Sequence, residues 1–223
     1  MVYSVAITGA TGYVGRALSK ALCQRGHSVR ALVRPGSGTR VATATEIREL
    51  DLFNVDELAQ GLKGCDSVVH LVGTAHPNPS KAQEFLRVDL ASARACIAAA
   101  MRSALAHFVY VSVAQPAPVM QAYLSARAEA ERVLSESRLP ATVVRPWYVL
   151  GPGHRWPILL VPMYAVAELF PALRAGARRL GLVTLGQMVD TLVEAIEQPP
   201  VGGANRLIEV PQIKQRRTGL LPR

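Results

Sequence analysis

The sequence is poor in cysteine and in aromatic residues. Its three cysteines, Cys23, Cys65 and Cys96, are scattered and form no CxxC pair. This pattern argues against a disulfide framework and against a zinc site, so we expect no metal ion and a reducing, cytoplasmic location. Aromatic residues make up only 5% of the chain and are not interleaved with basic residues, which disfavours nucleic acid as a partner.

The sequence also lacks an apolar run long enough to cross a membrane, which takes about 20 residues. The longest low-charge stretch, WPILLVPMYAVAELFPAL at 156–173, contains Glu168 and three prolines. We predict a buried helix there, with two alternatives: a wall of a substrate pocket, or a segment that lies on a membrane surface. Because the chain opens on an apolar strand, we expect no signal peptide.

Acidic residues are absent from the first 45 positions, although the whole chain carries a formal net charge of +9. The basic residues of that region are Arg16, Lys20, Arg25, Arg30, Arg34 and Arg40. They surround a glycine-rich segment, so the excess of positive charge indicates an anionic ligand such as a phosphorylated small molecule.

That segment, TGATGYVG at 8–15, lies between a predicted strand ending at Ile7 and a predicted helix starting near Val14. Its glycines, Gly9, Gly12 and Gly15, recur every three residues. A side chain at Gly9 would obstruct a tight turn, one at Gly12 would keep a pyrophosphate away from the backbone, and one at Gly15 would push the helix off the sheet. The free N–H groups at the helix start would then bind the phosphates.

A second predicted strand, 28–33, ends at Arg34. In an NAD-binding unit an acidic residue near this position holds the ribose 2′-hydroxyl, whereas an arginine accommodates a 2′-phosphate. Arg34 therefore favours NADP(H), with NAD(H) as the alternative, and a solvent-exposed loop arginine as the plain structural explanation.

Strand-like and helix-like segments alternate along the chain, which predicts a doubly wound parallel α/β sheet of the Rossmann type. Further strands are expected at 46–52, 67–73, 107–114, 141–144 and 206–210, and helices at 55–62, 81–104, 123–136 and 185–196. With 223 residues, half of them hydrophobic, the chain fits one domain. We assign 1–213 to that domain, with 147–200 on the substrate side, and 214–223 to a basic tail.

Several motifs, in order, resemble the extended and atypical branches of the short-chain dehydrogenase/reductase superfamily. Those branches include sugar-nucleotide epimerases, NmrA-like NADP sensors and quinone-reductase-like proteins. The matching segments are TGATGYVG (8–15), DL (51–52), VVHLVG (68–73), FVYVSVA (108–114), YLSARAEAE (123–131) and VVRPWYVLGPG (143–153). The resemblance and the glycine motif together give the predicted cofactor-binding residues: Thr8, Gly9, Thr11, Gly12, Tyr13, Val14, Gly15, Arg34, Asp51, Leu52, Leu71, Val72, Gly73 and Pro146.

The resemblance also implies a catalytic set of Tyr123, Arg127 and Ser112. In the family a tyrosine transfers the proton, and a lysine four residues later supports it and holds the nicotinamide ribose. Here Arg127 occupies the lysine position, and it can place a positive charge on the same helical face as Tyr123. Arginine and lysine are not interchangeable, however. The family serine aligns with Ser112 or with Val113.

The implied function is NADP(H)-dependent reduction or epimerisation of a small carbonyl or nucleotide-linked substrate. Two alternatives stay open: a non-catalytic NADP(H)-binding sensor or assembly subunit, and a reductase at the membrane periphery that acts on a quinone or a lipid. In a third reading of the same residues, Tyr123 and Ser112 are structural and have no catalytic duty.

Overall fold

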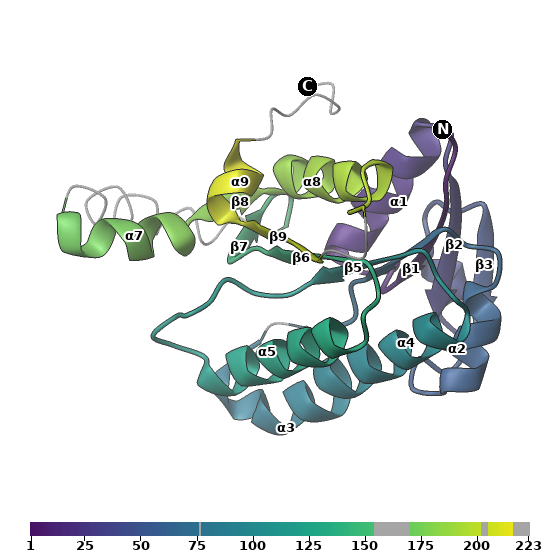
Figure 1. Ribbon diagram of the computed structural model, residues 1–223, viewed down its shortest axis with the longest axis horizontal. Coiled ribbons are helices and arrows are strands. Elements are labelled where there is room, and N and C mark those ends of the chain that lie inside the picture. Colours follow the sequence, from purple (N-terminus) through teal and green to yellow (C-terminus); the bar gives the residue numbers. More distant parts are fainter. Residues whose placement is uncertain (76, 154–169, 202–204, 216–223) are drawn as a thin grey trace.

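Seven parallel strands form the central sheet of the computed structural model, which describes residues 1–75, 77–153, 170–201 and 205–215 (Figure 1). The strand order is β3-β2-β1-β4-β5-β6-β9. The strands are β1 (Ser4–Thr8), β2 (Ser28–Val33), β3 (Glu46–Glu49), β4 (Ser67–His70), β5 (His107–Val111), β6 (Ala141–Arg145) and β9 (Asn205–Glu209). The predicted doubly wound parallel sheet is therefore confirmed.

Helices cover both faces of this sheet. Figure 1 shows α1 and α8 on one face and α2, α4 and α5 on the other. The helices are α1 (Tyr13–Gln24), α2 (Val55–Leu62), α3 (Ala82–Glu84), α4 (Ala91–Arg102), α5 (Gln121–Glu136), α7 (Pro171–Arg179), α8 (Leu185–Glu197) and α9 (Val210–Lys214). This arrangement follows from right-handed crossovers between parallel strands.

The two helical layers enclose two hydrophobic cores. Val5 and Ile7 of β1 belong to the core beneath α1 and α8, whereas Ala6 between them belongs to the core beneath α2, α4 and α5. Successive side chains of a strand point to opposite faces, so a strand buried on both sides reads as the continuous apolar run seen in the sequence.

The alanine-rich helix expected over 81–104 is interrupted. After the short α3, residues Phe85–Leu90 form a π-helical segment before α4 begins. Such segments widen the helix by one residue per turn and occur preferentially at functional sites. Asp89 lies in this segment, and its side chain is fully buried.

Two short strands within 147–200, the part assigned above to the substrate side, were not predicted. They are β7 (Tyr148–Leu150) and β8 (Leu182–Thr184), which pair in parallel as a separate sheet. Pattern analysis misses this pairing because the partners lie more than 30 positions apart and are three residues long each. Most of the apolar stretch 156–173 and most of the basic tail lie outside the described residues.

The order in which successive strands are added to the sheet reverses at β1. From β1 it proceeds outward to β2 and β3, and then returns to place β4 on the other side of β1. At such a point the connections leave the carboxyl ends of β1 and β4 toward opposite faces, and a crevice opens between them, where ligands bind in open α/β sheets.

Candidate active site

The glycine motif forms the turn between β1 and α1. Gly9 has a φ of +78°, and a Cβ there would lie 2.9 Å from the carbonyl carbon of Leu71. A Cβ at Gly15 would lie 2.3 Å from the carbonyl oxygen of Gly9. These distances confirm the steric reasons predicted for Gly9 and Gly15: one permits the turn, and the other permits the close approach of helix to strand.

The start of α1 has no side-chain cap. Gly12 is the N-cap residue, it supplies no side-chain acceptor, and the first turn contains no acidic residue. The N–H groups of a first helical turn have no partner within the helix. Together with the exposed backbone at Gly12, they form a cradle that a side chain would fill, which fits a bound pyrophosphate.

A cleft of about 430 Å³ extends from this turn across the crevice. Eight predicted cofactor-binding residues line it: Gly9, Thr11, Gly12, Arg34, Leu52, Leu71, Val72 and Gly73. Sequence reasoning missed seven further lining residues: Leu32, Val33, Ser37, Thr74, Ala75, Glu84 and Val88. The structure thus brings together the phosphate turn, the end of β2 and the segment after β4.

Three other predicted cofactor residues have partners within the protein. The Thr8 side chain is buried, and its Oγ1 lies 2.9 Å from Nδ1 of His70. The Asp51 carboxylate accepts a hydrogen bond of 2.9 Å from the backbone N–H of Phe53. The carbonyl of Pro146 accepts one of 2.9 Å from the N–H of Ala114. None of the three lines the cleft.

The remaining predicted members of the turn, Tyr13, Val14 and Gly15, also lie outside the cleft lining. Val14 packs against the core beneath α1. Tyr13 reaches the loop that follows β7: a Cβ at Gly151 would lie 2.0 Å from its hydroxyl oxygen. Burial raises the pKa of Tyr13. Gly151 of the predicted GPG turn thereby makes room for a side chain from the phosphate turn.

A side chain of β3 fixes the loop that follows β2. Both carboxylate oxygens of Glu49 accept backbone hydrogen bonds, from Gly36 N–H at 2.8 Å and from Gly38 N–H at 2.7 Å. These bonds lower the pKa of Glu49, so the carboxylate stays ionised. The guanidinium of Arg40 donates to Ser37 Oγ at 2.6 Å. Arg34 is exposed, and both it and Ser37 line the cleft.

Tyr123 and Arg127 lie one helical turn apart on α5, as the resemblance implied. The guanidinium carbon of Arg127 lies 5.2 Å from the centre of the Tyr123 ring. Phe85, from the π-helical segment, also packs against this ring, with ring centres 5.0 Å apart. The half-buried Tyr123 ring therefore contacts both a cation and an aromatic ring.

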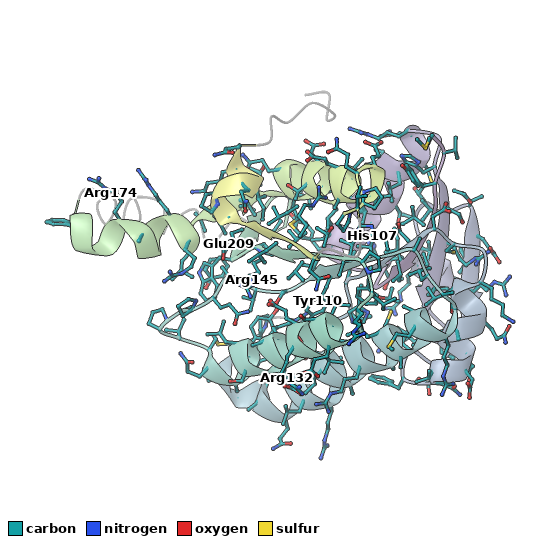
Figure 2. All side chains as sticks on the ribbon, viewed as in Figure 1. His107, Tyr110, Arg132, Arg145, Arg174 and Glu209 are labelled. Atoms are coloured by element: carbon teal, nitrogen blue, oxygen red, sulfur yellow. The ribbon has the colours of Figure 1, made fainter. Side chains whose placement is uncertain are left out.

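The guanidinium of Arg127 is buried and makes several contacts within the protein. Its Nη2 forms an ion pair of 2.7 Å with Oδ1 of Asp89, and its Nη1 donates to the carbonyl oxygen of Val111 at 2.9 Å. Burial acts to lower the pKa of Arg127, but Tyr123, Tyr110 and Asp89 outweigh burial and raise it. Figure 2 shows Tyr110 between the sheet and α5, where its hydroxyl lies 3.4 Å from Nη1.

Ser112 follows the last residue of β5 and is 4% exposed. Its backbone N–H donates to the carbonyl oxygen of Val144. Its hydroxyl is buried and has no hydrogen-bond partner among the residues that the structure describes. Val113, the alternative for the family serine, is packed in a small apolar cluster with Ala117 and Leu124. Ser112 is thus the residue of the two that keeps an unused polar group.

Asp89 is the main residue of this region that sequence reasoning missed. It accepts from Arg127 and also from the N–H and hydroxyl of Thr74, at 2.9 and 2.6 Å. A signal was present: an acidic residue lies four positions after Phe85 and seven before Cys96, on the apolar face of an alanine-rich helix. Charged residues are almost never buried without a partner, so this position predicts a cation opposite.

No cluster of His, Cys, Asp and Glu side chains among the residues that the structure describes could hold a metal ion. Among the same residues, no helix has the length and hydropathy needed to span a bilayer.

Several known proteins are similar in sequence to this chain. The NAD(P)H-binding family model matches residues 9–155. A ceramide reductase of Caulobacter vibrioides is 30% identical over 95% of this chain and 65% of its own length. A 4-hydroxy-2-methyl-3-oxo-4-farnesyl-3,4-dihydroquinoline-1-oxide ketoreductase of Stigmatella aurantiaca is 29% identical over 65% of this chain and 50% of its own length.

The fold is shared with a solved short-chain dehydrogenase/reductase superfamily protein from Agrobacterium tumefaciens with bound NAD. The TM-score is 0.68 with 18% sequence identity, over 93% of this chain and 77% of that protein. The chain spans half to just under two thirds of the length of the two curated relatives named above.

Proposed function

The chain belongs to the NAD(P)H-binding family, and from that premise we propose that it is an NADP(H)-dependent reductase of a carbonyl substrate, of the short-chain dehydrogenase/reductase type. The observation that carries the proposal is the glycine-lined cleft that begins at the uncapped N-terminus of α1. Gly73, which lines this cleft, lies against the guanidinium of Arg127, and that guanidinium in turn packs on the ring of Tyr123.

On the cofactor side, backbone groups hold the phosphates and side chains select the ribose. The N–H groups in the first turn of α1 would bind the pyrophosphate, beside Gly12, whose own N–H donates to the carbonyl oxygen of Gly9. Arg34 would pair with the 2′-phosphate of NADP(H), and Leu52 would lie against the adenine. Arg34 carries a planar set of donors suited to phosphate, and no acidic side chain lines the cleft at the end of β2.

On the substrate side, Tyr123 is the proposed proton donor. A bound nicotinamide would supply the hydride, as cofactors of this class do. The Tyr123 hydroxyl would give its proton to the carbonyl oxygen as that oxygen gains negative charge, and the Ser112 hydroxyl would donate a hydrogen bond to the same oxygen. The unused Ser112 hydroxyl supports this assignment.

The substrate class follows from the relatives and from region 147–200, which we assign to the substrate wall. The names of the two curated relatives denote reduction of ceramide-related and farnesylated molecules. We therefore favour a carbonyl carried by a largely apolar molecule over a nucleotide-linked sugar. Epimerisation is the alternative, since it uses the same cofactor and the same tyrosine.

The decisive experiment measures NADPH oxidation with a panel of ketones, aldehydes and quinones. We expect turnover in the wild type and a fall in kcat of about 10²–10⁴-fold in Tyr123→Phe, the usual contribution of general acid catalysis. Affinity for NADPH should be unchanged, because the aromatic ring remains and only the hydroxyl is lost. Turnover equal to that of the wild type in Tyr123→Phe would contradict the assignment.

A second candidate, a non-catalytic NADP(H)-binding protein, is favoured by one observation. The Arg127 guanidinium is engaged by Asp89 and Val111, so its geometry differs from that of a lysine free to hold a ribose. In this case NADPH would bind, the substrate panel would give no turnover, and Arg127→Lys would create none.

Contact with a membrane surface is a further part of the proposal. Figures 1 and 2 show α7 at the periphery of the molecule, with Arg174 at its outer side. Arg174 and Arg178 are exposed, and Phe170 before the helix is 56% exposed. Basic and aromatic groups together favour an anionic lipid surface. Arg174→Glu with Arg178→Glu should abolish sedimentation with phosphatidylglycerol vesicles and leave NADPH affinity unchanged.

A further inference from the structure

We propose that Asp89 is a positioning residue for cofactor binding: together with Arg127 it fixes the Gly73–Thr74 segment that forms one wall of the cleft. The inference rests on the proposed function, because it concerns the same cleft. It assigns Arg127 to a part of the site other than the ribose contact implied by the family resemblance.

Asp89 receives three hydrogen bonds from two segments of the chain. Its Oδ1 accepts from Nη2 of Arg127 at 2.7 Å. Its Oδ2 accepts from the backbone N–H of Thr74 at 2.9 Å and from the Thr74 hydroxyl at 2.6 Å. All three partners are donors, so the position requires a group that only accepts. Among side chains of this size, only an ionised carboxylate meets that requirement, because an amide has one accepting and one donating end.

Arg127 closes the arrangement from the side of α5. Its Nη1 donates to the carbonyl oxygen of Val111 at the end of β5. Its Nη2 lies so close to Gly73 that a Cβ there would be 2.3 Å from it. The guanidinium therefore occupies the space that any other residue at position 73 would need. Glycine at 73 and arginine at 127 fit one another.

The cluster is buried, while the segment it holds borders the cleft. The Asp89 and Arg127 side chains are 0% and 7% exposed. Gly73 and Thr74 line the cleft, and so does Val88, the residue before Asp89. The charge pair thus lies directly behind the wall that a bound cofactor would face.

The energetics favour a fixed wall. Removal of one partner from a buried ion pair leaves an uncompensated charge, which is strongly destabilising. The pair therefore has one low-energy arrangement, and the position of the Thr74 N–H follows from it. A wall that does not have to be ordered on binding lowers the entropic cost of binding the cofactor.

The first test compares Asp89→Asn with a matched control, Glu131→Gln. Glu131 lies on α5, as Arg127 does, and forms a partly buried ion pair with Arg145. Unlike Asp89, which bonds Thr74, neither Glu131 nor Arg145 pairs with a residue that lines the cleft. Both variants should lower the thermal midpoint. We expect Asp89→Asn to weaken NADPH binding, measured by calorimetry, at least ten-fold, and Glu131→Gln to change it less than two-fold. An unchanged affinity in Asp89→Asn, or equal losses in the two variants, would overturn the proposal.

A compensated variant covers the case in which Asp89→Asn does not fold. In the double variant Asp89→Asn with Arg127→Gln, the new amide at 89 can accept from Thr74 and donate to the new amide at 127. We expect this neutral pair to fold. If Asp89→Asn also folds, the double variant should bind NADPH at least three-fold more tightly than Asp89→Asn does. If Asp89→Asn is unfolded, the double variant should bind NADPH within ten-fold of the wild type. A folded double variant that binds NADPH more weakly than the limit for its case would contradict the proposal.

Hydrogen exchange separates this inference from the proposed function. In the cofactor-free wild type, the Thr74 amide should exchange slowly because Asp89 accepts its proton, and Asp89→Asn should speed its exchange more than ten-fold while the amides of β6 keep theirs. If the wild type binds neither NADPH nor NADH, the proposed function fails together with the cofactor part of the inference. If the wild type binds NADPH and Thr74 exchange is unaltered in Asp89→Asn, only the inference fails.

Discussion

The phosphate turn and the region around Tyr123 are built in different ways. The phosphate end is one continuous stretch, 8–15, whose geometry comes from glycines and backbone N–H groups. The Tyr123 end lies behind the cleft wall at Gly73 and Thr74, and none of its four side chains lines the cleft itself. It gathers Tyr123, Arg127, Asp89 and Ser112 from α5, the π-helical segment and the end of β5, and its geometry comes from buried charges and aromatic rings. The first end depends on local conformation, and the second depends on packing between distant segments.

This difference predicts different responses to substitution. At the phosphate end a change should affect the ligand and leave the fold intact, because Gly12 is exposed and a Cβ there would meet only the Gly9 carbonyl oxygen, at 3.1 Å. At the Tyr123 end a change to the Asp89–Arg127 pair should affect stability and ligand together, because the same contacts serve both.

The largest effect is expected at Gly12. In Gly12→Val the added side chain should keep the pyrophosphate from the backbone and cost at least two charge-assisted hydrogen bonds, each worth about 1.5–3 kcal/mol. NADPH affinity measured by calorimetry should therefore fall by roughly a hundred-fold or more, while the circular dichroism spectrum and the thermal midpoint stay close to those of the wild type. Binding at wild-type strength would show that the phosphates lie elsewhere.

A smaller effect, on stability, is expected at Gly73. In Gly73→Ala the methyl group should displace the Arg127 guanidinium from Asp89 and lower the free energy of unfolding by about 1–3 kcal/mol, as overpacking of a core does. The control is Gly176→Ala in α7, where no neighbouring atom lies within 4 Å of the added Cβ and where alanine should stabilise the helix. Urea unfolding of both variants measures their free energies of unfolding. A Gly73→Ala variant as stable as the wild type would contradict a rigid Asp89–Arg127 pair.

The smallest effect is the response of stability to acid. Burial, with a contribution from Arg127, lowers the pKa of His70 near the phosphate turn to about 3. Burial, with a contribution from Arg206, lowers that of His107 to about 4. In the unfolded chain both histidines would have a pKa of about 6.5. Below pH 6.5 the unfolded state therefore binds protons that the folded state does not, so stability falls as the pH falls.

At pH 5.5 each histidine should have lowered the free energy of unfolding by about 1.2 kcal/mol relative to pH 7. Urea unfolding at the two pH values measures the loss, and His107→Gln should remove about half of it. His107 lies at the amino end of β5 (Figure 2), away from the cleft, so this variant should leave cofactor affinity unchanged. A loss of the same size in His107→Gln would contradict the assignment.

The parts of the structure that the sequence predicted are those governed by local rules. Helix 55–62 and strand 28–33 agree in their bounds with α2 and β2. The parallel sheet followed from the alternation of segments, and the roles of Gly9 and Gly15 followed from what a side chain would meet. The bounds of α2 and β2 and the contact between Gly15 and Gly9 each depend on residues close together in the sequence.

The parts that were missed depend on contacts between distant residues. The pairing of β7 with β8 joins residues 148–150 to 182–184, and the π-helical segment interrupts a helix whose composition is uniform. The Asp89–Arg127 pair joins positions 38 apart. The residue type at 89 signalled a buried partner, but only the packing of α5 against the π-helical segment shows which cation provides it.

The measurement that tests the account most directly is a calorimetric titration of NADPH and of NADH into the wild type and into Arg34→Ala. The account predicts that the wild type binds NADPH more tightly than NADH by about 1.5–3 kcal/mol, the value of a charged hydrogen-bonded contact, and that Arg34→Ala removes most of this difference without weakening NADH. Equal affinity of the wild type for both cofactors would contradict the assignment of Arg34, and binding of neither would contradict the central claim that this cleft holds a nicotinamide dinucleotide.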